Sequence, residues 1–203
     1  MPRYSGGDLV VAGGGVKGME AALYASKLGL RVTLYERAGQ LGGQLLHIFD
    51  ERKKREFSRL LDYYRYALEK AGGVQVVLGG EEFRGGKDAL LCTPEVTYSE
   101  VKPVGGGELR IDSNIYMYHD AALRYAGEAE VTMTERSLSS LDRARAMGFR
   151  KAAEARGVRF VRSLEDPPTV RLIVREQYDL RAAMVSGRKA VDDMLALEGN
   201  LYL

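Results

Sequence analysis

The chain has 203 residues, 45% of them hydrophobic, which is enough to fill the core of one substantial domain with a small appendage. Thirty basic and 28 acidic residues leave a net charge of +2, so neither nucleic acid nor an anionic membrane is expected as a partner. One cysteine excludes an intramolecular disulfide and a cysteine-ligated iron–sulfur cluster, and two histidines argue against a metal site. Any redox chemistry must therefore come from a bound organic cofactor.

Two further features concern location. No apolar run is long enough to span a bilayer, and no charged-then-apolar leader precedes the first predicted strand. We therefore expect a globular protein of the cytoplasm.

The first motif has the order of a nucleotide-binding βαβ unit. The apolar run 8–12 predicts a strand buried on both faces of a parallel sheet. Gly13, Gly15 and Gly18 follow as G-x-G-x-x-G, and residues 19–28 have apolar positions at helical spacing. The first glycine allows a tight turn, the second has no Cβ to block a pyrophosphate, and the third lets the helix approach its strand. The predicted phosphate-binding residues are Gly13, Gly14, Gly15, Val16, Lys17 and Gly18.

Free N–H groups and the helix macrodipole attract the phosphates in such a loop, so the Lys17 side chain is optional. Gly29 is placed to end the helix, and residues 31–35 predict the second parallel strand, which Glu36 closes. A carboxylate there can accept both hydroxyls of an adenosine ribose and would repel the 2′-phosphate of NADP, although Arg37 beside it weakens that exclusion.

A glycine-rich loop, Leu-Gly-Gly-Gln-Leu, follows and contains Gly42, Gly43 and Gln44. With Gly-Gly-Gly-x-x-Gly-Met-Glu-Ala-Ala and Val-Thr-Leu-Tyr-Glu-Arg before it, the run 13–45 resembles the FAD-binding half of the two-dinucleotide-binding flavoproteins. The resemblance is closest to the C-terminal FAD/NAD module of old yellow enzyme-like 2,4-dienoyl-CoA reductase and trimethylamine dehydrogenase. More distant relatives of the same type are heterodisulfide reductase and the small subunit of glutamate synthase. The resemblance implies FAD, with Glu36 on the ribose and the Gly-Gly-Gln loop near the pyrophosphate and flavin.

The middle of the chain predicts one amphipathic helix over 51–71 and strands over 75–78 and 87–93. In the resembling family the last of these strands ends in an Ala-Thr-Gly turn whose backbone approaches the cofactor. Thr93 fits that turn, whereas Pro94 replaces the glycine and removes a donor. Cys92 is expected to be a small buried apolar residue. Residues 96–101 and 108–111 alternate around three glycines and predict a hairpin.

No second G-x-G-x-x-G follows Gly18, so one good dinucleotide site is expected. The run 114–122 has two interpretations. It resembles the late strand whose aspartate, here Asp120, holds the ribityl chain of FAD, although His119 stands in place of the family's glycine. The slightly favoured alternative is a reduced NAD-type βαβ with a strand over 114–118, a helix over 121–126 and a second strand ending at Glu135. Without glycines the phosphates could not approach that carboxylate, which would serve structure.

The rest of the chain predicts a helix over 138–156, strands over 157–162 and 169–175, and a helix over 180–197 with Asp179 as its N-cap. That helix resembles the last one of the FAD fold, whose N-terminus points at the flavin. The expected fold is α/β, a Rossmann-type parallel sheet with a small β-hairpin or meander insertion and a reduced second α/β portion. The expected domains are 1–112 for FAD binding, 113–168 as a reduced NAD-type insertion, and 169–203 returning to the FAD domain.

These patterns favour an FAD-binding oxidoreductase component that passes electrons to a partner subunit or substrate, because no NAD(P)H motif is present. The alternative is a non-catalytic module that holds FAD, NAD or ADP. We expect a protein partner subunit or a homo-oligomer. No side chain is identified as catalytic, although His47 and Tyr98 are candidates without a partner nearby in sequence.

Overall fold

The computed structural model of the chain describes residues 6–48, 51–80, 89–93, 101–105, 107–173 and 180–197. The chain divides into two compact units, each built around its own parallel sheet. The first unit comprises Met1–Leu46, Arg55–Thr97 and Tyr178–Leu203, and the second comprises His47–Lys54 and Tyr98–Gln177.

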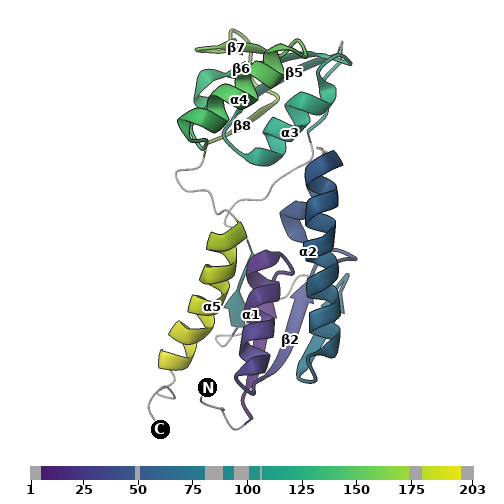
Figure 1. Cartoon of the computed structure of the whole chain (residues 1–203), viewed down its shortest axis with the longest axis vertical. Helices are drawn as coiled ribbons and strands as arrows, with labels where there is room; N and C mark the ends of the chain where they lie inside the picture. Colours follow the sequence, from purple (N-terminus) through teal and green to yellow (C-terminus); the bar gives the residue numbers. More distant parts are fainter. Residues whose placement is uncertain are drawn as a thin grey trace. The chain divides into compact units, whose positions relative to one another are not determined.

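The first unit is a four-stranded parallel sheet in the order β3-β2-β1-β4. Its core is formed by strand residues such as Leu9, Val11 and Leu34 together with the inner faces of the helices. In Figure 1 the last helix, α5, runs beside α1. The elements are β1 (Asp8–Ala12), α1 (Val16–Lys27), β2 (Arg31–Glu36), the short 3₁₀ helix η1 (Gly43–His47), α2 (Glu51–Lys70), β3 (Val74–Leu78), β4 (Ala89–Leu91) and α5 (Leu180–Leu197). The last residue of η1 and the start of α2, up to Lys54, are grouped with the second unit.

A buried carboxylate ties the helices of the first unit together. Glu20 of α1 accepts the hydroxyl of Tyr64 from α2 at 2.8 Å and the Nε–H of Arg188 from α5 at 2.5 Å. Burial, together with this carboxylate, raises the pKa of Tyr64 above its usual value, so the phenol stays a donor. Gly187 makes the contact between α5 and α1 possible, because a Cβ there would lie 2.4 Å from the carbonyl oxygen of Lys17.

The second unit is also a four-stranded parallel sheet, in the order β7-β6-β5-β8. Its core has Leu109, Ile111 and Met133 on the strands, with Ala121 and Ala122 of α3 packed against them. The elements are β5 (Glu108–Ser113), α3 (Tyr116–Tyr125), β6 (Glu130–Thr134), the 3₁₀ helix η2 (Glu135–Leu138), α4 (Arg143–Glu154), β7 (Arg159–Val161) and β8 (Val170–Leu172).

The α/β class with Rossmann-type parallel sheets is confirmed, but three local predictions are wrong. Residues 114–118 do not form a strand, because β5 ends at Ser113 and α3 begins at Tyr116. The segment 108–111 is a central parallel strand rather than one arm of a simple hairpin, although Val104 and Glu108 do form an antiparallel bridge; residues 96–100 lie outside the described part. The helix predicted over 138–156 begins only at Arg143, where Asp142 caps it by accepting the N–H of Arg145 at 2.9 Å.

The observed division of the chain places β5 and β8 with the second sheet, whereas boundaries at 112 and 168 would have placed most of β5 and all of β8 with the first. Among the described helices, none is both long enough and apolar enough to cross a membrane.

Candidate functional site: a dinucleotide loop at the end of β1

The turn after β1 can be made only by glycine. Gly13 has φ +110°, a left-handed conformation, and its N–H donates to the carbonyl of Tyr35 at 2.8 Å. A Cβ at Gly13 would lie 2.9 Å from the backbone of Cys92, and one at Gly18 would lie 1.8 Å from the carbonyl oxygen of Gly13. These two glycines therefore bring β1, β4 and the start of α1 into direct backbone contact, as the motif predicts.

Gly15 has a different role, because nothing lies within 4 Å of the Cβ that it lacks. It is the N-cap of α1 in an extended conformation, with no side chain capping the helix. The N–H groups of Val16, Lys17 and Gly18 therefore have no acceptor within the helix. Open space beside free N–H groups and the positive end of a helix dipole is a suitable place for a phosphate anion.

Glu36 is the last residue of β2 and lies against the glycine turn that follows β1. Its Oε2 accepts the N–H of Gly14 at 2.6 Å and its Oε1 accepts the N–H of Ala38 at 2.7 Å. Gly14 is also enclosed, since a Cβ there would lie 2.5 Å from Leu41 and 2.8 Å from the Glu36 Cβ. The carboxylate is thus held beside the phosphate-binding turn, while the neighbouring Arg37 is exposed.

The predicted Gly-Gly-Gln loop lies against the same turn. Gly42 donates its N–H to the carbonyl of Gly14 at 2.9 Å, and a Cβ at Gly43 would lie 3.0 Å from the Cα of Gly15. Both glycines have positive φ, of +140° and +52°. Gln44 follows in η1 with an exposed side chain. Sequence reasoning missed Ala38 and Leu41, whose N–H group and side chain help to fix Glu36 and Gly14.

β4 brings the last predicted residue of this group into place. The Cys92 N–H donates to the carbonyl of Ala12 at 2.8 Å, and the N of Thr93 lies 3.0 Å from the position of a Gly13 Cβ. Thr93 is exposed, whereas Cys92 is buried as expected, and burial raises the pKa of its thiol to about 11. Pro94, Tyr98, Asp179 and the side chain of His47 lie outside the described part of the structure.

Asp120 lies elsewhere, in the second unit. The segment that was expected to carry it as part of a strand forms the helix α3 instead. Asp120 is 3% exposed, and its carboxylate accepts a hydrogen bond from Lys53 at 2.9 Å. Its neighbour His119 lies 2.6 Å from the carbonyl of Ser137 through Nε2, so that nitrogen must donate. The role of Asp120 at a flavin therefore stays a prediction without the strand that motivated it.

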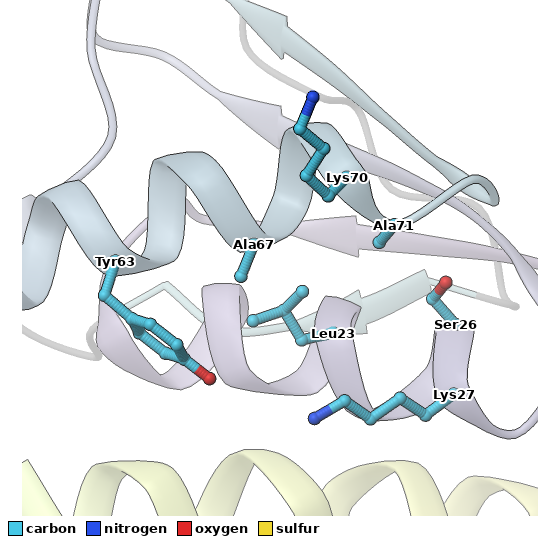
Figure 2. A pocket seen from close by; sticks show the side chains of 7 residues that line it. All are labelled: Leu23, Ser26, Lys27, Tyr63, Ala67, Lys70 and Ala71. Atoms are coloured by element: carbon cyan, nitrogen blue, oxygen red, sulfur yellow. The ribbon is translucent and has the colours of Figure 1, made fainter.

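A groove lies between α1 and α2, away from this loop (Figure 2). Its volume is about 330 Å³. Its α1 residues belong to the last turns of that helix, whereas the dinucleotide loop lies at the other end of α1, so this groove is not the nucleotide crevice. Within the described ranges, no group of three or more His, Cys, Asp or Glu side chains could hold a metal ion. The groove is lined by Leu23, Ser26, Lys27, Tyr63, Ala67, Lys70 and Ala71.

Residues 8–50 match the family described as FAD dependent oxidoreductase. Bilirubin reductase of Mediterraneibacter gnavus is 49% identical over 55 residues, which are 27% of this chain and 9% of that protein. The small chain of the NADPH glutamate synthase of Mycobacterium tuberculosis is 32% identical over 112 residues, 53% of this chain and 23% of that protein. The structure of 6-hydroxypseudooxynicotine amine oxidase from Pseudomonas geniculata N1 superposes with a TM-score of 0.66 at 15% identity and covers 94% of this chain and 42% of that one.

The chain thus spans less than half of each of these proteins. At 15% identity the structural match shows a shared fold. The family match is more informative, because residues 8–50 contain the glycine turn, Glu36 and the Gly42-Gly43 loop that the structure brings together. It supports FAD as the cofactor.

Proposed function

We propose that this chain is an FAD-binding oxidoreductase component that passes electrons between a reduced donor and a partner subunit or substrate. The observation that carries the proposal is the open Gly15 position, which lies beside the free N–H groups of α1 and within the same turn as the Glu36 carboxylate. The family match over residues 8–50 supports FAD in preference to ADP or NAD.

The residues present fit the ADP half of FAD. The N–H groups at the start of α1 would bind the pyrophosphate, and Glu36 would accept the ribose hydroxyls while Ala38 and Gly14 keep its oxygens in place. Gly43, which lies against Gly15, would cover the diphosphate from the side of the Gly-Gly-Gln loop. When bound, FAD supplies the electron-transfer chemistry, and the protein supplies binding and orientation.

The relationship of this chain to one particular group of flavoproteins is also a proposal. We infer a place among flavoproteins of the old yellow enzyme-like dienoyl-CoA reductase and trimethylamine dehydrogenase type. The match to an amine oxidase structure over 94% of this chain is compatible with that type, although the match shows fold alone. In such an arrangement the substrate-converting site would lie on another part of the protein or on a partner subunit.

The first test is a visible spectrum of the purified protein, followed by acid release and mass identification of the nucleotide. The proposal predicts a yellow protein that releases FAD, or a colourless one that turns yellow when FAD is added. A protein that releases ADP or NAD and refuses FAD would overturn the redox role and leave a nucleotide-binding module.

A paired substitution links that result to the loop. Gly15→Ala places a methyl group in the open space where the diphosphate would lie, without straining the backbone, since φ is −73°. We expect FAD affinity to fall by about tenfold or more, corresponding to ~1.4 kcal/mol. Gly148→Ala, at an exposed and equally open glycine of α4, is the matched control and should bind FAD as the unmodified chain does. Equal affinities in both variants would place the cofactor elsewhere.

A further inference from the structure

The two units repeat one fold in the same register. Leu9 of β1 pairs with Val32 of β2, and Leu109 of β5 pairs with Val131 of β6. Leu109 therefore corresponds to Leu9, 100 residues earlier, and Val131 corresponds to Val32, 99 residues earlier. The strand orders β3-β2-β1-β4 and β7-β6-β5-β8 correspond throughout. The helices that follow begin at Val16 and Tyr116, again 100 residues apart. The sequence keeps a trace of this repeat, because Val-Thr-x-x-Glu-Arg occurs at 32–37 and again at 131–136.

This register identifies what stands at each glycine position in the second unit. Ser113, Ile115 and Tyr118 replace Gly13, Gly15 and Gly18. Ile115 is the N-cap of α3 and is 4% exposed, so a buried apolar side chain stands where Gly15 leaves open space. Tyr118 is 2% exposed and stands where Gly18 makes its close backbone contact in the first unit. Ser113 has no left-handed φ, since none of the described non-glycine residues does. The tight turn that exposes the helix N–H groups is therefore not repeated.

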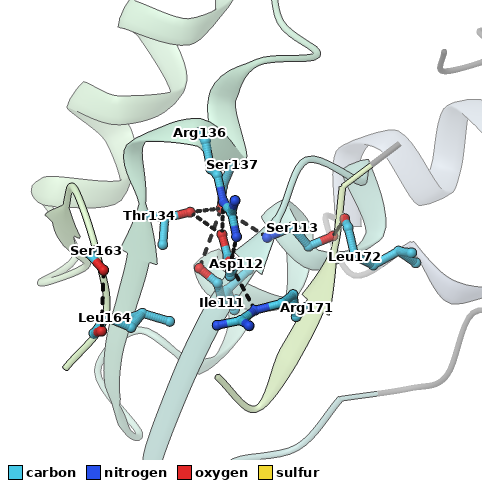
Figure 3. A network of polar contacts seen from close by, with 10 residues as sticks. All are labelled: Ile111, Asp112, Ser113, Thr134, Arg136, Ser137, Ser163, Leu164, Arg171 and Leu172. Atoms are coloured by element: carbon cyan, nitrogen blue, oxygen red, sulfur yellow. Dashed lines mark hydrogen bonds and ion pairs between the residues drawn. The ribbon is translucent and has the colours of Figure 1, made fainter. Parts of the chain in front are cut away.

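Polar side chains of the second unit also fill the end of its sheet, as Figure 3 shows. Asp112, which corresponds to Ala12, is 2% exposed and accepts hydrogen bonds from Thr134 at 2.8 Å and from the Nε of Arg136 at 2.5 Å. The Nε of Arg171, from β8, lies 3.2 Å from the other oxygen. The hydrogen bonds from Arg136 above all hold the pKa of this carboxyl below its usual value, so Asp112 stays charged and paired.

The two acidic residues at corresponding positions have different partners. Glu36 accepts a loop N–H in the first unit, whereas Glu135 is exposed and lies 3.6 Å from Nη1 of Arg150 on α4. In the second unit the hydroxyl of Ser137 accepts the N–H of Ser113 instead, at 3.0 Å. Among the described residues, neither an open phosphate position nor a free ribose carboxylate is left at this end of the second sheet.

We propose that the second unit is a duplicate of the dinucleotide-binding fold whose own nucleotide site is closed by Ile115, Tyr118 and the Asp112 ion-pair cluster. In the two-dinucleotide-binding flavoproteins that the sequence resembles, the second such unit would bind NAD(P)H, and the residues present here do not fit one. The second unit then supplies no hydride from NAD(P)H bound at its sheet; for the redox role proposed above, the electrons would come from another donor. This inference concerns the second unit alone and does not depend on FAD being the ligand of the first.

The test is a titration of the whole chain with NADH and with NADPH, followed by calorimetry and by nicotinamide fluorescence, with ADP titrated in parallel. We expect one ADP site per chain, which Gly15→Ala weakens, and no saturable nicotinamide nucleotide binding in the Gly15→Ala variant. Because the decisive titration uses a variant of the first unit only, it does not require a substituted second unit to fold.

Two results would overturn the proposal. One is a second ADP site per chain, and the other is saturable NADH or NADPH binding that persists in Gly15→Ala. Binding that is instead abolished by Gly15→Ala would place the nicotinamide nucleotide in the first unit; this supports the closed second site while counting against FAD as the resident cofactor. The failures of the two proposals are therefore distinguishable.

Discussion

The Oε2 atom of Glu36 accepts the N–H of Gly14 at 2.6 Å, which joins the acidic end of β2 to the middle of the phosphate-binding turn. One carboxylate therefore supports the loop, and in the proposed FAD complex it would also accept the ribose hydroxyls. Its counterpart in the repeat, Glu135, pairs with Arg150 instead, so the two glutamates form a natural comparison.

We predict that Glu36→Ala weakens nucleotide binding by about 10- to 100-fold, because charge-assisted hydrogen bonds contribute ~1.5–3 kcal/mol. The matched variant Glu135→Ala should leave binding unchanged, since that side chain is exposed at the surface of the second unit. Titration of the apoprotein with FAD, followed by the quenching of flavin fluorescence, measures both. A loss of affinity in Glu135→Ala equal to that in Glu36→Ala would contradict the assignment.

The close contact between α5 and α1 predicts a large effect of one methyl group. In Gly187→Ala the new Cβ would lie 2.4 Å from the Lys17 carbonyl oxygen, so α5 must move away. We expect the free energy of unfolding in urea to fall by about 1–3 kcal/mol, as for other overpacked contacts. Gly148→Ala, on the exposed face of α4, should instead raise it by ~0.5–1 kcal/mol through helix propensity. Similar changes in both variants would mean that α5 does not pack as described.

His119 predicts a pH dependence of stability. Burial lowers the pKa of this imidazole from 6.5 to about 4, and Lys53 also disfavours its charged form, although Nε2 donates to the Ser137 carbonyl. Since the unfolded chain binds a proton at higher pH than the folded one, the stability contribution is complete above pH 6.5 and is lost as the pH falls toward 4. The slope cannot exceed about 1.4 kcal/mol per pH unit for one proton.

Urea unfolding between pH 7 and pH 4 measures this slope. The variant His119→Gln should lose it, whereas His47→Gln, at the other histidine, should keep it. Asp112 contributes in a lower range, because a carboxyl with a lowered pKa loses its stabilisation only as the pH falls below 3.8. An unchanged slope in His119→Gln would show that this imidazole is not buried in solution.

The thiol of Cys92 is buried beside the glycine turn, so we predict that it reacts slowly with thiol reagents. Cys92 has a pKa raised to about 11 by burial, so little thiolate forms at pH 8. We expect its reaction with a disulfide reagent to be slower than in the unfolded chain by a factor on the order of 100. Spectrophotometric release of the reagent's thiol, before and after denaturation, measures the ratio. Comparable rates would show that the end of β4 is open to solvent.

The sequence by itself determined the first unit, because its glycines carry local information. A turn with positive φ at Gly13 and a helix that approaches Gly13 at Gly18 admit no other residue, so the spacing implies the geometry. The acidic residue after the second strand and the Gly42-Gly43 loop could be predicted for the same reason. The prediction that the cofactor is FAD came from the resemblance of residues 13–45 to known flavoproteins.

Only the tertiary structure decided the second unit. Residues 114–118 are rich in aromatic and β-branched side chains, so their pattern favoured a strand, but β5 already fills that place in the sheet and the chain turns into α3. The repeat of Val-Thr-x-x-Glu-Arg was visible in the sequence, yet the register shared by the two sheets was needed to align Ile115 with Gly15. In the sequence Asp112 is an ordinary polar residue, and its partner Arg171 is 59 positions away. Contacts of that kind depend on which strands are neighbours, which no local pattern encodes.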